Sequence, residues 1–547
     1  MNTRWTSSAD AVVVGFGLTG APVLERLLDA SGANDVAVLD RGGFWEPEGH
    51  SFPGERSLIL DRPLTVDPGE DHVLLRTPGA GPARLRKWWA SRLAGGGSWL
   101  WYGQLSRFRP SDLRMRSAYG GALGPEVRDW PLDFAELERA YDHVQGRLRP
   151  FGCAYGHTEA AYREFDGGPY RRRPGPSHLE RTLVDRLGRD GMNAYVGQSC
   201  LGGRAWDTCP VSPDTGRPAE RDRPLLARPN WYVELYGRLR KDPRVRLLGG
   251  CYVSRVLVAG GAVQGVEYLQ RDDAGELRTR RVRCGTVVLT PGALETTRIL
   301  LSSDLPNRNG LLGRRFTFTL ERTAYLVTAE PRDRDLTDRL AGLYGNVVIK
   351  DFYDLGEKGP LRKGGKFALY DAYVAESPAR HVRNLRMLGP ELAAFLRAER
   401  GHYVVKVSFK GESLPSADKF VSLSARRNAF GARVPTVTYA PHPADLLLQE
   451  RVTGILPGIG RALGAVETRV HPVPSGEGLV SAHHHGGAVF GEDAAQAVLD
   501  RDCECFEARG LFVADSSFMP TSGATNSSLT AMANAHRVAG AVAARLS

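Results

Sequence analysis

Three consecutive histidines, His483 to His485, stand before two glycines and are the side chains of this sequence best suited to chemistry. An imidazole titrates near neutral pH, so it can act as a general base or bind a metal ion. On a strand, His483 and His485 face one way and His484 the other, so the three cannot meet at one ion unless the backbone is irregular. No cluster of cysteines or acidic residues lies beside them, and we expect no metal site.

A second chemical signal is the glycine triplet Gly15, Gly17 and Gly20 near the start of the chain. An apolar strand-like run precedes it, a helical pattern follows it, and a second apolar run ends at Asp40. These features predict a βαβ unit whose glycines allow a tight turn, close approach to a pyrophosphate and close packing of helix on strand. Asp40 would accept hydrogen bonds from an adenosine ribose. The pattern fits NAD and FAD equally.

Several further elements must position these groups. Short β-runs are expected at 245–248, 252–258, 263–268 and 287–289, and the last of them reads as a return to the dinucleotide domain. From about 315 to 470 strands dominate, interrupted by one helical segment near 390–400, which predicts an antiparallel sheet with helices on one side. Residues 151–225 look loop-like, and 529–546 look like a closing helix.

Composition excludes several classes of protein. The 547 residues are 42% hydrophobic and 24% charged, as in an ordinary globular protein, and no apolar window reaches the roughly 18 residues of a membrane span. The net charge of +10 arises from basic residues scattered among acids, so we expect no nucleic-acid partner. Seven cysteines without a CxxC pair predict reduced thiols and a cytoplasmic location.

Several blocks of the sequence occur in an order that is similar to a known family. They are Gly15 to Gly20, the GGxS turn near 97, Asp129-Trp130-Pro131, Gly292 to Leu301, the HxxGG block from His483, Val513 to Ser516 and Asn526 to Thr530. Taken together they resemble the glucose-methanol-choline (GMC) family of FAD-dependent oxidoreductases over nearly the whole chain. In style the chain is closest to the pyranose oxidase, gluconate dehydrogenase and sugar-alcohol dehydrogenase branch.

The resemblance implies an α/β fold, with a Rossmann-like FAD-binding domain and an inserted α+β substrate domain built on an antiparallel sheet. It also implies FAD rather than NAD, with the flavin facing a substrate pocket under that sheet. The HxxGG register makes His483 the catalytic base and Asn526 its partner, while His484 or His485 would take that role if the strand held a one-residue bulge. A neutral imidazole would remove the hydroxyl proton, and the asparagine amide would stabilise the developing alkoxide.

The resemblance further implies a set of residues that contact FAD: Gly15, Gly17, Gly20, Asp40, Gly97, Ser98, Val253, Asp515, Ser516, Asn526 and Ser528. Some carbohydrate-oxidising relatives carry a His-Trp pair after the GGxS turn, and that histidine is joined covalently to the flavin. Here the matching pair is Leu100-Trp101, and leucine cannot form the bond, so we expect noncovalent FAD.

The function predicted on this basis is FAD-dependent oxidation of an alcohol to an aldehyde or ketone. The expected substrate is a sugar, a glycoside or an aminoglycoside-type biosynthetic intermediate, and the expected electron acceptor is oxygen or a quinone-like molecule. A steroid or aromatic alcohol oxidase would share every motif and differ in an apolar pocket, to which Trp88, Trp89, Trp99, Trp101 and Tyr102 could contribute. A non-catalytic flavin-binding protein is a further alternative.

The expected organisation interleaves the two domains. FAD-binding segments are expected at 1–150 and 226–315, substrate-domain segments at 151–225, which is loop-rich, and 316–470, and a C-terminal segment for FAD binding and catalysis at 471–547.

Overall fold

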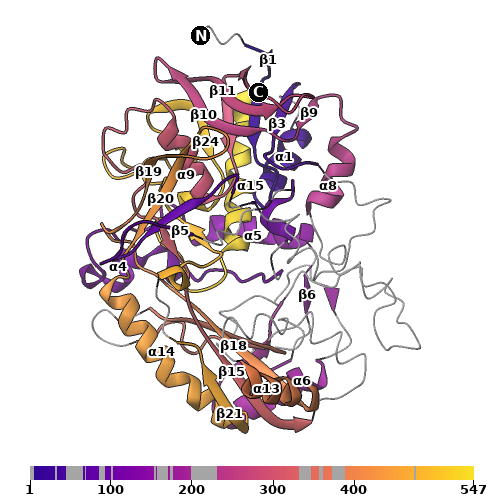
Figure 1. Ribbon diagram of the computed structural model, residues 1–547, viewed down its shortest axis with the longest axis vertical. Coiled ribbons are helices and arrows are strands. Elements are labelled where there is room, and N and C mark those ends of the chain that lie inside the picture. Colours follow the sequence, from indigo (N-terminus) through magenta and orange to yellow (C-terminus); the bar gives the residue numbers. More distant parts are fainter. Residues whose placement is uncertain are drawn as a thin grey trace.

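The computed structural model describes residues 5–44, 66–85, 91–156, 171–198, 231–331, 347–371 and 388–547, with gaps of one to four residues inside some of these ranges. The molecule is elongated. A ten-stranded sheet lies at one end of its long axis and a six-stranded sheet lies at the other (Figure 1). Both termini lie at the end that carries the ten-stranded sheet.

The ten-stranded sheet has a parallel core built from distant parts of the chain. Across the sheet, this core consists of β24 (Ala508–Val513), β13 (Thr286–Leu289), β2 (Ala11–Val14), β3 (Val36–Leu39) and β9 (Val245–Leu248). An extension adds β10 (Tyr252–Ala259), β11 (Ala262–Arg271), β12 (Leu277–Arg283), β1 (Ser7–Ser8) and β23 (Glu504–Cys505). The continuous apolar runs of the central strands are buried on both faces, as a parallel sheet requires. The predicted return of 287–289 to the first domain is confirmed by its pairing with β2.

Helices cover this sheet. They are α1 (Gly20–Asp29), α5 (Phe134–Leu148), α8 (Trp231–Leu239), α9 (Ala293–Ser302) and α15 (Ser528–Leu546). The helix α1 turns Val23, Leu24, Leu27 and Leu28 into the core at helical spacing, and it packs against α15 from the far end of the chain. The predicted closing helix is therefore confirmed, and it covers the N-terminal βαβ unit.

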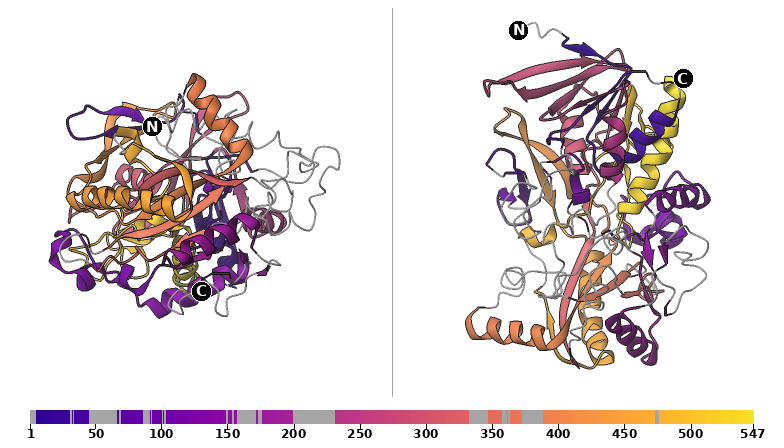
Figure 2. Two further views of the ribbon diagram at one scale, coloured as in Figure 1. Left: turned by 90° about the horizontal axis from the view of Figure 1, so that it is seen from below. Right: turned by 90° about the vertical axis from the view of Figure 1, so that its right-hand side faces the viewer.

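The six-stranded sheet is antiparallel throughout, as predicted. Its strands in order are β21 (Ala465–Val470), β15 (Leu320–Pro331), β18 (His402–Gly411), β17 (Gly365–Asp371), β16 (Val347–Ile349) and β8 (Ala194–Val196). Helices α6 (His178–Arg189) and α14 (Pro443–Ala462) bury their apolar faces against one side of it. Helix α13 (Gly389–Gly401) packs on the other side through Phe395 (Figure 2). The prediction that helices lie on one side is therefore wrong.

Two helices lie where the sequence predicts none. The expectation of a single helix within 316–470 is wrong because α14 follows α13; Pro457 and several glycines inside α14 disguise its helical pattern. Helix α6 lies within the stretch expected to be loop-like. Its start carries a capping box in which Ser177 and Glu180 satisfy each other's backbone N–H groups.

Smaller sheets join the two ends of the molecule. A four-stranded sheet contains β19 (Lys419–Arg427), β20 (Arg433–Tyr439), β4 (Val73–Arg76) and β5 (Ala83–Leu85), and two-stranded pairs join β14 (Thr317–Phe318) to β22 (His484–His485) and β6 (Phe151–Gly152) to β7 (Arg171–Arg172). Short helices α3 (Pro110–Leu113) and α4 (Met115–Tyr119) complete the described elements. Among the helices of the described ranges, none is both long and apolar enough to cross a bilayer.

Candidate active site

An open cavity of about 270 Å³ runs from the glycine turn after β2 to the histidine segment. It collects most of the residues predicted to contact a cofactor or substrate: Gly15, Gly17, Asp40, Gly97, Val253, His483, Asp515, Ser516 and Ser528. These residues come from widely separated parts of the chain, and the fold brings them together. The cavity lies at the carboxyl ends of β2 and β13, where open α/β sheets bind ligands.

Each of the first three glycines has a different reason to lack a side chain. Gly15 has φ +92°, and a Cβ there would lie 2.9 Å from the Cα of Pro291. A Cβ at Gly20 would lie 2.4 Å from the carbonyl oxygen of Gly15, so Gly20 allows α1 to approach the turn. At Gly17 a Cβ would meet only ordinary contacts at 3.9 Å, and the residue faces the cavity. The empty space beside Gly17 is where a pyrophosphate could approach the backbone.

The second glycine-rich turn packs on the first. The backbone N–H of Gly95 donates to the carbonyl of Phe16 at 2.6 Å, and Gly97 lines the cavity. Ser98 is placed differently, because its buried hydroxyl donates to the carbonyl of Gly95 at 2.6 Å and closes the turn. Ser98 thus shapes the cavity without lining it.

Asp40 and Asp515 are oriented by backbone N–H donors at the edge of the cavity. Asp40 accepts from Phe16 at 2.8 Å and from Gly42 at 2.7 Å. Asp515 accepts from the N–H of Gly292 at 2.9 Å and from the hydroxyl of Thr296 at 2.5 Å. Burial raises the pKa of both carboxyls, and the donated hydrogen bonds oppose that rise. Each carboxylate therefore joins neighbouring segments of the chain at the edge of the cavity.

The remaining predicted contacts also have structural partners. The carbonyl of Val253 accepts from the Nη2 of buried Arg298 at 2.5 Å, and the hydroxyl of Ser516 donates to the carbonyl of His484 at 2.6 Å. Ser528 opens α15, so the N-terminal turn of that helix faces the cavity. Such a turn favours a ligand with negative or electron-rich groups.

The three histidines occupy distinct environments. His483 and His484 line the cavity, whereas His485 does not and its Nε2 is 2.8 Å from the hydroxyl oxygen of Ser527. Burial, then the charges of Lys410, His484 and Lys366, lowers the pKa of His483 to about 3. Burial also lowers the pKa of His484 to about 4 and that of His485 well below its usual value. All three imidazoles are therefore neutral near pH 7, and in the described part of the chain no cluster of metal ligands forms.

Polar atoms without partners remain at this end of the cavity. Within the described residues, the Nδ1 of His483, the Nε2 of His484 and the Oδ1 of Asn526 are buried and make no hydrogen bond. Asn526 itself is not part of the cavity lining, but the next two residues, Ser527 and Ser528, are. Unsatisfied buried polar atoms in a native fold call for a partner. The glycine cradle, the volume and these atoms together fit a bound dinucleotide with a substrate beside it.

Comparisons with known proteins agree with this geometry. Residues 415–535 match the family model described as GMC oxidoreductase. The chain is 27% identical to paromamine 6'-oxidase of Streptomyces fradiae and 25% identical to 6'''-hydroxyparomomycin C oxidase of Streptomyces lividus, covering 98% of this chain and 92% of the relative in each case. The solved structure of pyridoxine 4-oxidase from Mesorbium loti superposes with a TM-score of 0.62 at 15% identity, covering 98% of this chain and 99% of the other.

Residues 415–535 are therefore a GMC oxidoreductase domain. The predicted fold class is confirmed, since the chain matches this solved structure over almost its full length. GMC oxidoreductases are flavin enzymes, so the comparisons imply a flavin cofactor for this chain. Leu100, Trp88, Trp89 and Tyr102, which entered the predictions on covalent attachment and on an apolar pocket, lie outside the described residues.

A polar row on the six-stranded sheet is a feature that sequence reasoning missed. Glu321, Lys410 and Lys366 lie directly opposite one another on β15, β18 and β17. Lys410 forms an ion pair with Glu321, and the Nζ of Lys366 donates to the hydroxyl of Ser106 at 2.6 Å. Because both lysine charges act on His483, this row lies near the histidine end of the cavity. The available signal was the presence of Lys366, Lys406 and Lys410 among the apolar residues of β17 and β18.

Glu412 was also missed. It follows β18 and is buried, and its Oε1 accepts from the N–H and the hydroxyl of Ser522, each at 2.8 Å. Its Oε2 has no hydrogen-bond partner in the part of the chain that the structure describes. Burial, then the charge of Asp112, raises the pKa of Glu412 to about 7. The carboxyl group is thus poised between its two protonation states near neutral pH, and its partner Ser522 lies on the loop that leads to Asn526.

Proposed function

We propose that this protein oxidises a hydroxyl group of a sugar, glycoside or aminoglycoside-type substrate to an aldehyde or ketone. The observation that carries the proposal is the cavity that runs from the glycine turn after β2 to His483, whose surroundings include the charges of Lys410 and Lys366. The activities in the names of the two Streptomyces relatives support an aminoglycoside or a related sugar as the substrate. When bound, FAD supplies the acceptor for the hydride that leaves the alcohol carbon.

In this proposal His483 is the general base. Its imidazole is neutral near pH 7 because burial lowers its pKa, and its buried Nδ1 has no partner among the described residues. It can therefore accept the hydroxyl proton of the substrate. Asn526 would donate from its amide to the oxygen on which negative charge develops, without adding a charge of its own. His485 is the weaker rival because it does not line the cavity and its Nε2 pairs with the hydroxyl of Ser527.

The chain's own groups would hold the cofactor noncovalently. Gly17 and Gly97 leave room for the pyrophosphate, Asp40 is placed for the ribose, and Val253 offers its backbone to the adenine. Ser516, Ser528 and the N-terminal turn of α15 would contact the flavin end. We propose oxygen or a quinone-like molecule as the acceptor that reoxidises the flavin. The thiols of the four described cysteines are unpaired, which supports a reducing, cytoplasmic setting.

The polar row also discriminates between the substrate classes. Glu321, Lys410 and Lys366 place three charged groups near His483, and such polar surroundings suit a hydroxylated ligand better than a steroid or aryl alcohol. A sugar can hydrogen-bond to such groups. We therefore favour a hydroxylated substrate.

The test is flavin reduction without oxygen. Purified protein loaded with FAD is mixed anaerobically with sugars, aminoglycosides, sterols and aryl alcohols, and the flavin absorption band is followed. Bleaching by a sugar or an aminoglycoside is the expected result. Flavin that stays oxidised with every alcohol would favour a non-catalytic flavin-binding protein, and bleaching by sterols alone would favour the apolar alternative.

A further inference from the structure

Glu412 is a buried carboxyl group that the proposed reaction does not use. It follows the last residue of β18 and is 2% exposed. Its Oε1 accepts from the backbone N–H and from the hydroxyl of Ser522, each at 2.8 Å. Ser522 lies four residues before Asn526 on a loop, residues 521–527, that forms neither helix nor strand. The contact therefore joins the six-stranded sheet to the loop that carries Asn526.

This loop is held near both of its ends by buried side chains. Near its start, Glu412 accepts from both donors of Ser522. At its end, the hydroxyl oxygen of Ser527 lies 2.8 Å from the Nε2 of His485. A segment outside helices and strands has no ladder of backbone hydrogen bonds to fix its path, so side-chain partners must do so. Asn526 lies between the two anchors, and its position depends on them.

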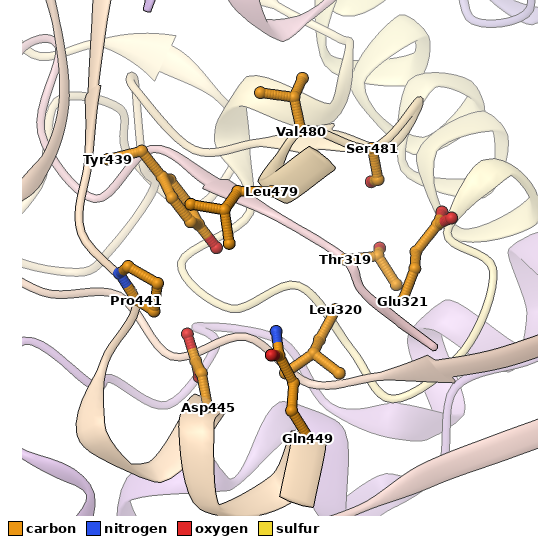
Figure 3. A pocket seen from close by; sticks show the side chains of 10 residues that line it. All are labelled: Thr319, Leu320, Glu321, Tyr439, Pro441, Asp445, Gln449, Leu479, Val480 and Ser481. Carbon is orange, nitrogen blue, oxygen red and sulfur yellow. The ribbon is translucent and has the colours of Figure 1, made fainter. Parts of the chain in front are cut away.

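The residue after Glu412 holds the hydroxyl of Ser522 from another side. The backbone N–H of Ser413 donates to the Oγ of Ser522 at 2.9 Å. The hydroxyl of Ser413 is fixed in turn, because it donates to Asp445 at 3.0 Å and lies 3.0 Å from the hydroxyl of Tyr439. Figure 3 shows Asp445, at the start of α14, and Tyr439 on the wall of one small hollow. The contact between Glu412 and Ser522 thus belongs to a connected, buried set of hydrogen bonds.

The charged groups around Glu412 are paired with one another. Asp112 of α3 and Lys363, which precedes β17, form a buried ion pair at 2.8 Å, and Lys419 pairs with Asp445 at 2.5 Å. Among the described residues Glu412 forms no ion pair, and its Oε2 has no hydrogen-bond partner there. A buried carboxyl in this setting costs stability, and side chains that cost stability are expected where function requires them.

We propose that Glu412 is a positioning residue for the oxidation, which holds the loop through Ser522 so that the amide of Asn526 meets the substrate oxygen. The inference rests on the proposed function, in which Asn526 donates to the oxygen that gains negative charge. A donor of this kind acts in the transition state, and a misplacement of about 1 Å can cost about 100-fold in rate. Oε1 can accept from Ser522 whether or not the carboxyl is ionised, so the role requires an acceptor and not a charge.

The test uses variants that remove or keep this acceptor. Glu412→Ala removes both hydrogen bonds to Ser522, Ser522→Ala removes one of them, and Glu412→Gln keeps a carbonyl oxygen in place of Oε1. Thr328→Val is the control, because it removes a buried hydroxyl whose hydrogen bond, to the carbonyl of Tyr403 at 2.9 Å, joins β15 to β18 instead of the loop. Each protein is loaded with FAD, and anaerobic flavin reduction by paromamine and by glucose is followed by stopped flow. FAD content and urea unfolding are measured alongside.

We expect Glu412→Ala to lower the limiting rate of flavin reduction about 10- to 100-fold, with the apparent Kd of the alcohol and the FAD content near those of the wild type. Ser522→Ala should show a smaller loss, and Glu412→Gln and the control should stay within about threefold of the wild-type rate. In an Asn526→Ala background, Glu412→Ala should cost less than about threefold, because the donor that Glu412 positions is already absent. A residue with a structural role alone would lower the rate equally in both backgrounds.

A wild-type limiting rate in Glu412→Ala, or an equal loss with and without the Asn526 amide, would overturn the positioning role. A raised Kd with an unchanged limiting rate would also overturn it, since Glu412 would then act on substrate binding. If Glu412→Ala does not retain FAD, Ser522→Ala decides, and a wild-type rate in that variant overturns the role. If neither probe reduces the flavin of the wild type, the proposed function itself fails and the positioning role fails with it.

Discussion

Replacing Gly17 by alanine should separate cofactor binding from folding. A Cβ at this position would meet the Gly95 carbonyl oxygen and the Gly96 Cα at 3.9 Å, which is ordinary van der Waals contact. The protein itself can therefore accommodate the methyl group. The same methyl group would project where a pyrophosphate must approach the backbone, because Gly17 lines the cofactor cavity.

The substitution should slightly stabilise the protein without FAD and reduce the stabilisation that FAD provides. A glycine-to-alanine change at a compatible site stabilises a fold by about 0.4–1 kcal/mol, so the apoprotein should be at least as stable as the wild type. FAD at a thousand times its Kd stabilises the wild type by about 4 kcal/mol, and a hundredfold weaker affinity would reduce this gain to about 1.4 kcal/mol. The variant should thus lose about 2.7 kcal/mol of the stabilisation that FAD provides.

Urea unfolding of both proteins with and without FAD, together with the flavin content after gel filtration, measures these differences. Gly20→Ala is the contrasting variant, because its Cβ would lie 2.4 Å from the carbonyl oxygen of Gly15 and should destabilise the apoprotein directly. Normal FAD binding by Gly17→Ala, or unfolding of its apoprotein, would refute this reasoning.

Three other outcomes are expected. Since the pKa of His483 is lowered to about 3 and a base works in its neutral form, the rate of anaerobic flavin reduction should stay level between about pH 8 and about pH 5; a decline centred near 6.5 in stopped-flow traces would contradict this. The pKa of Glu412 is raised from 4.5 to about 7, so the folded protein loses stability as the pH rises through this window. Above pH 7, Glu412→Gln should therefore be more stable to urea than the wild type, by about 3 kcal/mol. An equal or lower stability of the variant there would be inconsistent with a buried neutral carboxyl. Acid precipitation should release all flavin into the supernatant, whereas flavin retained in the pellet would mean a covalent link.

The dinucleotide-binding half could be predicted because its signals are local. Continuous apolar strands such as β2 and β3, and glycines whose absence of a side chain is required by the turn, are visible in sequence. Helix α14 was hidden because Pro457 lies inside it, where its missing N–H and fixed φ normally end a helix. Tertiary packing against the six-stranded sheet outweighs that local cost. The start of α6 did have a signal in the sequence, because Ser177 and Glu180 form a capping-box pattern that predicts the first residue of a helix.

The residues of the candidate site also fall into those that the sequence could predict and those that it could not. His483 and the cofactor contacts follow motifs, whereas the row of Glu321, Lys410 and Lys366 depends on which residues stand opposite each other in three strands. Cross-strand register over such distances is fixed by packing and not by any nearby residue pattern.

The most direct test of the central claim is the rate of anaerobic flavin reduction in His483→Ala and His484→Ala, with FAD content measured in each. Removing a general base should slow the reaction by about 10²- to 10⁴-fold. The account predicts this loss for His483→Ala with FAD still bound, and a far smaller change for His484→Ala. A large loss in His484→Ala with near-normal reduction in His483→Ala would contradict the assignment.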